Sequence, residues 1–127
     1  MSVDARAHAF LRLADENKAL AHRLFREDDP PLRWVATVGF YSSIHYIGAY
    51  LWAHEGREIS DHAQRNIEIH HDPMLRRIVP NYRTLFIHSI RARYRAYYKA
   101  TPDQVAELLN RDLALLESSV RANLPPS

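Results

Sequence analysis

The segment from residue 34 to residue 52 is apolar over most of its circumference when it is drawn as a helix. At ~100° per residue, one continuous stripe carries Trp34, Val38, Tyr41, His45, Ala49 and Trp52. A narrow edge remains for water and carries Ser42, Ser43, Tyr46 and Tyr50. A helix with so wide an apolar surface belongs inside a helical domain. We therefore expect a central helix here, with Trp34, Tyr41, His45 and Trp52 buried.

The rest of the chain predicts further helices around this segment. Apolar stripes indicate helices over residues 4–26 and 81–99, and a capping box at Thr101 and Gln104 begins a last one. Asp29 before two prolines and Gly56 bound the central helix, and Ser60 begins a short polar helix over residues 61–71. The prediction is a single all-α domain over residues 1–127, an antiparallel bundle of four long helices plus a short connecting helix.

Composition narrows the class of protein. Of 127 residues, 46% are hydrophobic and 25% charged, which is typical of globular proteins. The sequence has no cysteine, which excludes disulfides and thiolate metal sites. The N-terminal residues lack the apolar run of a signal peptide, and the apolar helix is interrupted by His45 and tyrosines. We expect a cytoplasmic protein with no membrane contact.

Positive charge is concentrated in one part of the sequence. The net charge is +2, yet no acid occurs between Asp72 and Asp103. That stretch carries Arg76, Arg77, Arg83, Arg91, Arg93, Arg95 and Lys99, interleaved with Tyr82, Tyr94, Tyr97 and Tyr98. Arginine among aromatic residues is typical of a nucleic-acid surface when it is exposed on one face. The alternative is a solvated helix whose charge is balanced by acids on a neighbouring helix.

Several ionisable side chains are placed where they could form a site. His45 lies on the central apolar stripe, and Arg93 falls within the apolar arc of its helix, whereas Arg91, Arg95 and Lys99 fall on the solvent side. Each could be a structural core residue with local hydrogen bonds. On the short helix, His62 and Arg65 are three residues apart and share a face.

Three stretches resemble the helical HEPN superfamily, and in particular its small bacterial members. They are W..T..FYSSIH...A.L in the central helix, DHAQRN in the short helix, and Y..L...S..ARY in the long helix that follows. The resemblance covers roughly residues 34–116. Many HEPN proteins are metal-independent endoribonucleases, with a motif of an arginine, a polar residue, a few more positions and a histidine. Arg65, Asn66 and His70 match that spacing.

The resemblance implies an RNA-acting protein, either a ribonuclease or the toxin-like component of a two-component module with a cognate partner protein. Arg65 and His70 would be the catalytic pair, and His45, His62, Arg93 and Tyr94 would line the same pocket. In the family the motif is paired across a homodimer, which we expect here as well. Histidine and arginine can supply the acid, the base and the cation for RNA cleavage, so no metal or cofactor is predicted.

The alternative is a non-catalytic HEPN module that binds a nucleotide or a partner. Arg65 and His70 are separated by ~140° on a regular helix and meet only through a distorted turn or across a dimer. Convergence of His45, His62, Arg65 and Arg93, with His70 directed elsewhere, would favour the binding module over the ribonuclease.

Overall fold

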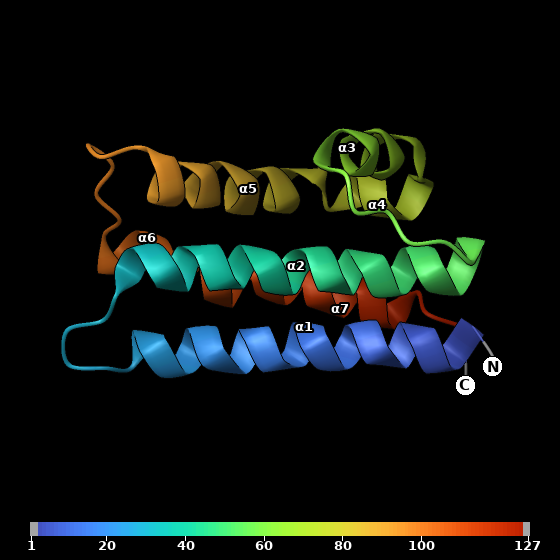
Figure 1. Cartoon of the computed structure of the whole chain (residues 1–127), viewed down its shortest axis with the longest axis horizontal. Helices are drawn as coiled ribbons and strands as arrows, with labels where there is room; N and C mark the ends of the chain where they lie inside the picture. Colours follow the sequence, from blue (N-terminus) through green and yellow to red (C-terminus); the bar gives the residue numbers. More distant parts are fainter. Residues whose placement is uncertain (1–2, 126–127) are drawn as a thin grey trace.

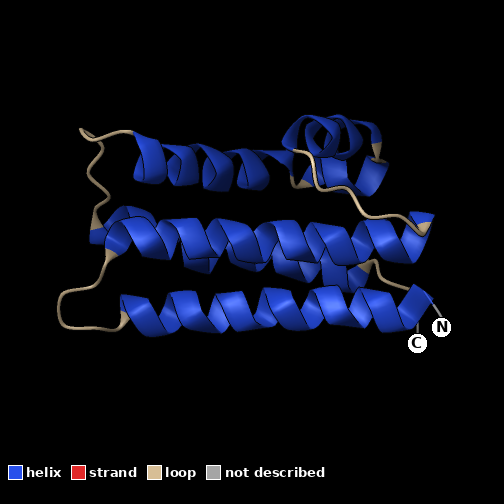
Figure 2. Ribbon diagram, in the orientation of Figure 1, coloured by secondary structure: helices blue, strands red, loops and turns tan. Residues whose placement is uncertain are grey.

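The computed structural model describes residues 3–125, with side chains from residue 5 onward, and every regular element in that range is a helix. The all-α prediction is therefore confirmed (Figure 2). The elements are α1 (Val3–Phe25), α2 (Leu32–Glu55), α3 (His62–His71), α4 (Pro73–Arg77), α5 (Val79–Tyr94), α6 (Pro102–Glu107), the π-helix η1 (Leu108–Leu113) and α7 (Ala114–Ala122).

Helix α2 lies at the centre of the molecule. Helices α1, α2 and α5 lie side by side and alternate in direction, and the rod formed by α6, η1 and α7 lies behind α2 (Figure 1). The short helix α3 is viewed nearly end-on in Figure 1 and lies across the start of α5. Because α1, α5 and the last rod cover three sides of α2, its fourth side has no helix of residues 3–125 packed along it.

The prediction for the aromatic stripe of α2 is wrong in part. Trp34 is 62% exposed and Tyr41 is 38% exposed, while His45 and Trp52 are half-buried. These side chains lie toward the uncovered side of α2. An apolar stripe fixes which residues share a face, but it does not fix which face the neighbouring helices cover.

The edge that we expected to face water is instead buried. Ser42, Ser43 and Tyr46 are fully buried and Tyr50 nearly so. The Ser42 hydroxyl donates to the Ala14 carbonyl at 2.8 Å, and the Tyr46 hydroxyl donates to the Asp15 carboxylate at 2.5 Å. A buried hydroxyl costs little when it has an acceptor. Hydroxyl contacts to α1 therefore allow this polar edge to form the core face.

Helix α5 ends at Tyr94, five residues before the predicted end. The Arg33 guanidinium on α2 donates to four backbone carbonyls at this point, those of Ala92, Arg95, Ala96 and Tyr98. These bonds hold residues 95–98 in a turn beside α2 rather than in a further helical turn. Tertiary hydrogen bonds thus override a helical propensity that the sequence shows locally.

Other helix ends agree more closely with those predicted from the sequence. Gly56 ends α2 with a positive φ of 66°, and the capping box of Thr101 and Gln104 is present. Two predicted caps are wrong: Pro31 rather than Asp29 precedes α2, and Asp61 rather than Ser60 caps α3.

Three basic side chains are exposed as predicted, namely Arg91, Arg95 and Lys99. Within residues 3–125, no helix combines the length and apolarity needed to span a membrane.

The Tyr46 contact provides a test of the buried polar edge. Tyr46→Phe should lower the free energy of unfolding by about 1–3 kcal/mol, because it removes a buried hydrogen bond to a carboxylate. The matched control is Tyr97→Phe, which removes a hydroxyl from a side chain that is 97% exposed. Urea denaturation should show a loss for the first variant and none for the second. Equal stability of the two variants would contradict the assignment.

Candidate functional site

Helix α3 is fixed at both ends by aspartate caps. The Asp61 side chain accepts from the Ala63 amide at 3.4 Å and begins α3. Asp72 ends α3 and begins α4, accepting from the amides of Met74 at 2.9 Å and Leu75 at 3.0 Å. The Tyr50 hydroxyl of α2 contacts both Asp72 oxygens, at 2.9 and 3.0 Å. A helix of this length is not stable alone, and these contacts hold it against α2.

Arg65 on α3 is a buried cation, and its hydrogen-bond acceptors in the described part of the chain are uncharged. It is only 6% exposed. Its Nη1 donates to His62 Nδ1 at 3.0 Å, and its Nη2 donates to the Ile59 carbonyl at 3.3 Å. Among the residues that the structure describes, Arg65 forms no ion pair with an acid. Buried arginines are usually paired, so this guanidinium retains capacity for an anion.

His62 and His45 lie next to Arg65, and the pKa of each is lowered, which favours the neutral ring. Because arginine only donates, His62 Nδ1 must accept and the proton of its neutral ring is on Nε2. Burial lowers the pKa of His62, and the charges of Arg65 and Arg93 lower it further while Asp61 opposes them. Burial also lowers the pKa of His45, helped by Arg65 and opposed by Glu58.

Arg93 continues this group of cations toward the end of α5. It is half-buried on the side of α5 that faces α2, as the sequence predicts. Its Nη1 donates to the Tyr41 hydroxyl at 3.3 Å, and its guanidinium lies 5.5 Å from the Tyr41 ring centroid and 5.4 Å from that of Tyr94. Its Nε is buried and has no acceptor among the described residues.

We call Arg65, His62, His45 and Arg93 the Arg65 cluster. Two cavities of about 280 Å³ each adjoin it, one at each end. The first is lined by Phe10, Ile44, His45, Gly48, Glu58, Ile59, Ser60 and Arg65, and the second by Arg33, Trp34, Thr37, Ala92 and Arg93. The acids Glu58 and Asp61 are close to the two histidines, but neither neutralises a guanidinium of the cluster through an ion pair within residues 3–125.

The remaining two predicted site residues lie apart from this group or at its edge. His70 lines a separate groove of about 240 Å³ with Asn66, Tyr82, Arg83, Phe86 and Ile87. Its Nδ1 bonds to the Asn66 carbonyl at 2.8 Å. Arg65 and His70 therefore line different cavities within one protomer, and Tyr82 lies between the two. Tyr94 is 70% exposed and contacts the cluster through the Arg93 guanidinium.

Three further residues belong to this site, and the sequence analysis did not assign them to it. Trp34 and Tyr41 were expected in the core, because exposed aromatics cannot be told from buried ones by periodicity. Tyr82 is buried, and its hydroxyl has no partner among the described residues. The Tyr82 ring lies 5.8 Å from that of Phe40, on which His62 also stacks, so Tyr82 borders the Arg65 cluster. Burial raises the pKa of Tyr82, and the Arg65 charge opposes the rise. Its position in the apolar arc of α5 gave no sign of such a contact.

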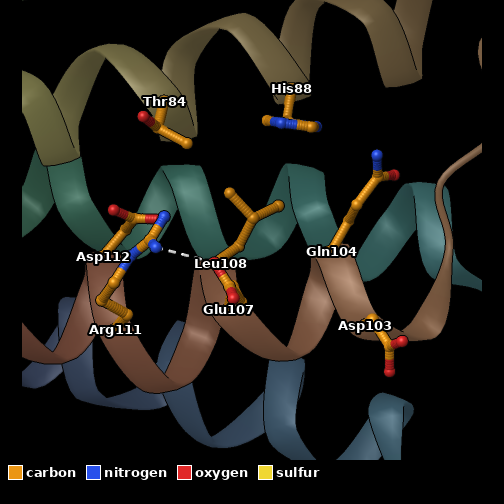
Figure 3. Close-up of a pocket in the computed structure, with 8 residues that line it drawn as sticks. All are labelled: Thr84, His88, Asp103, Gln104, Glu107, Leu108, Arg111 and Asp112. Atoms are coloured by element: carbon orange, nitrogen blue, oxygen red, sulfur yellow. Dashed lines mark hydrogen bonds and ion pairs between the residues drawn. The ribbon is translucent and has the colours of Figure 1, made fainter.

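Another cavity of about 280 Å³ lies between α5 and the start of the last rod (Figure 3). Thr84 and His88 line it from α5, opposite acids of α6 and η1 (Figure 3). Its charges are largely satisfied internally, since Arg111 pairs with Glu107 at 2.7 Å and with Asp112 at 3.4 Å. The charged side chains of this cavity therefore need a charged ligand less than the Arg65 guanidinium does.

Comparisons with known proteins give no relative to guide the assignment. No family model matches the chain, and neither a curated protein nor a solved structure matches it. No group of three or more histidine and carboxylate side chains within the described residues could hold a metal ion. The function of the candidate site is therefore inferred from its geometry alone.

The lowered histidine pKa values predict a pH dependence of stability. A histidine whose pKa is lowered on folding binds fewer protons in the folded state, so stability is lost as the pH falls below the unfolded value of about 6.5. His62→Asn, which keeps an acceptor for Arg65, should reduce the loss measured by urea denaturation between pH 7.5 and 5. An unchanged slope would contradict the environment assigned to His62.

Proposed function

We propose that this chain is a HEPN-like, RNA-acting protein whose Arg65 cluster binds a phosphate group of its ligand. The observation that carries the proposal is the burial of Arg65 with no carboxylate partner among the described residues. A guanidinium in such a position forms strong, charge-assisted hydrogen bonds to phosphate oxygens. The neutral His62 holds it in place through Nδ1 and keeps an Nε2 proton for donation.

The surroundings of the cluster support an RNA ligand over a simple anion. The Arg93 guanidinium lies 5.5 Å from the Tyr41 ring centroid and 5.4 Å from that of Tyr94, and both tyrosines are exposed. Proteins that bind single strands combine arginines with aromatic side chains on which bases stack. The exposed residues Arg91, Arg95 and Lys99 add positive charge on the same helix and the turn after it. Binding alone, without cleavage, is the function that this arrangement within one protomer supports best.

Removal of Arg65 tests the proposal. Arg65→Ala should weaken binding of a labelled single-stranded RNA decamer, measured by fluorescence anisotropy in EDTA, by about 10- to 100-fold, because a charged hydrogen bond contributes ~1.5–3 kcal/mol. Arg83→Ala is the matched control, since it removes the same charge from the exposed groove beside His70. Equal weakening by the two variants would indicate general charge attraction and would contradict a phosphate site at Arg65.

A metal-independent ribonuclease is the second candidate function, and one observation favours it. His70 is exposed, and its Nδ1 contact to the Asn66 carbonyl leaves the lone pair of the neutral ring on Nε2. That nitrogen could act as a general base on RNA. Catalysis with Arg65 would then require a homodimer that brings His70 of a second copy to the Arg65 cluster.

The two candidates differ in their response to His70→Ala. If the chain only binds RNA, this variant binds with unchanged affinity and the wild type leaves the RNA intact in EDTA. If it is a ribonuclease, the wild type shortens the RNA in EDTA, and both Arg65→Ala and His70→Ala abolish cleavage. Sedimentation at micromolar concentration should then give a dimer, and a monomer that still cleaves would reject the composite site.

A further inference from the structure

A cavity of about 280 Å³ lies where the start of α2 meets the end of α5. Trp34, Arg33 and Thr37 line it from α2, and Ala92 and Arg93 line it from α5. Trp34 is 62% exposed at its edge. An indole left this accessible beside a cavity provides a large flat surface for a ligand to cover.

Most polar groups of the cavity wall are already satisfied. Arg33 donates at 3.1 Å to the Ala92 carbonyl and at 2.5 to 3.1 Å to three carbonyls of residues 95–98. The Thr37 hydroxyl donates to the Arg33 carbonyl at 2.8 Å. These bonds fix the wall of the cavity. What the wall leaves unused is the exposed Trp34 ring and the Arg93 guanidinium, whose one hydrogen bond within the described residues goes to the Tyr41 hydroxyl.

A flat apolar surface beside unused guanidinium donors fits a planar ring that carries acceptor atoms. We propose that this cavity binds a nucleobase, which stacks on Trp34 and accepts a hydrogen bond from Arg93. The inference depends on the function proposed above, because the phosphate of the same ligand binds at Arg65 and His62. It adds that recognition requires a base as well as a phosphate.

The cavity and the phosphate site are joined by Arg93. The His62 ring stacks on Phe40 with centroids 6.1 Å apart, and the Phe40 ring lies 6.1 Å from that of Tyr41. The Arg93 guanidinium lies 5.5 Å from the Tyr41 ring centroid, so the two ends of the cluster are close. Residues 73–102 include no acid, and the exposed side chains beyond the cavity include Tyr94, Arg95 and Tyr97. A negatively charged strand can continue over this surface without meeting a like charge. An acid-rich or purely apolar partner would not use both Trp34 and the Arg93 donor.

Tryptophan fluorescence reports directly on the cavity. Trp52→Phe leaves Trp34 as the sole tryptophan, and the Trp52 Nε1 that it removes makes no hydrogen bond in the described structure. Titration of this variant with single-stranded RNA in EDTA should quench the emission with a saturable curve. Inorganic pyrophosphate, which has phosphate but no base, should compete with the RNA and cause no quenching by itself.

A second variant separates the base from the phosphate. Trp34→Leu, an exposed substitution, should weaken RNA binding by about 5- to 100-fold, since stacking of one base contributes ~1–3 kcal/mol, and should leave pyrophosphate binding within twofold. Arg65→Ala should weaken binding of both ligands.

The outcomes distinguish the two proposals. RNA binding that depends on Arg65 but neither changes Trp34 emission nor responds to Trp34→Leu would overturn the base site and leave the phosphate site standing. Failure of both RNA and pyrophosphate to bind would overturn both. A change in Trp34 emission with protein concentration alone, together with a dimer in sedimentation, would show that a second copy covers the cavity and would overturn the base site.

Discussion

The site depends on one constraint, which is that Arg65 is removed from water while no carboxylate within residues 3–125 pairs with it. Its two hydrogen-bond acceptors are a neutral histidine nitrogen and a backbone carbonyl. Neutral acceptors compensate only part of the cost of burying a full charge. The surrounding structure must therefore hold Arg65 in place, and the aspartate caps of α3 and the Tyr50 contact to Asp72 do so. Such an arrangement lowers the stability of the fold and holds a cation ready to bind a ligand. This combination is expected at a functional site rather than in a core.

The uncovered side of α2 connects this cation to the rest of the proposed binding surface. Hydroxyls on the opposite side of α2 find acceptors on α1, so that side can pack as core although its sequence is polar. The aromatic stripe is consequently left beside Arg93 and the end of α5. Arg33 then fixes where α5 ends, so Tyr94 and the turn that follows are held next to Trp34 and Tyr41. The phosphate site and the aromatic surface are thus both results of how α2 is oriented.

Part of this site could be predicted from the sequence, because helical spacing is local. The pairing of His62 with Arg65 and the position of Arg93 toward α2 both follow from the helical repeat. The orientation of α2 could not be predicted in this way. Both the aromatic stripe and the edge with Ser42 and Tyr46 are compatible with burial, and only the acceptors of these two hydroxyls on α1 decide which one is buried. The early end of α5 likewise depends on Arg33, some 59 residues away along the chain. The spacing of Arg65 and His70 matches a catalytic motif, yet spacing alone cannot show that the two side chains enter different cavities.

The most direct test of the account is the stability of Arg65→Met, which replaces the buried cation with an apolar side chain of similar length. If Arg65 is held for a ligand rather than for the fold, the unliganded variant should unfold in urea with a free energy within about 1 kcal/mol of the wild type, or above it, because the cost of burying the charge is removed. A loss of about 3 kcal/mol or more would show that Arg65 is a structural tie between α3 and the core, and would contradict the central claim.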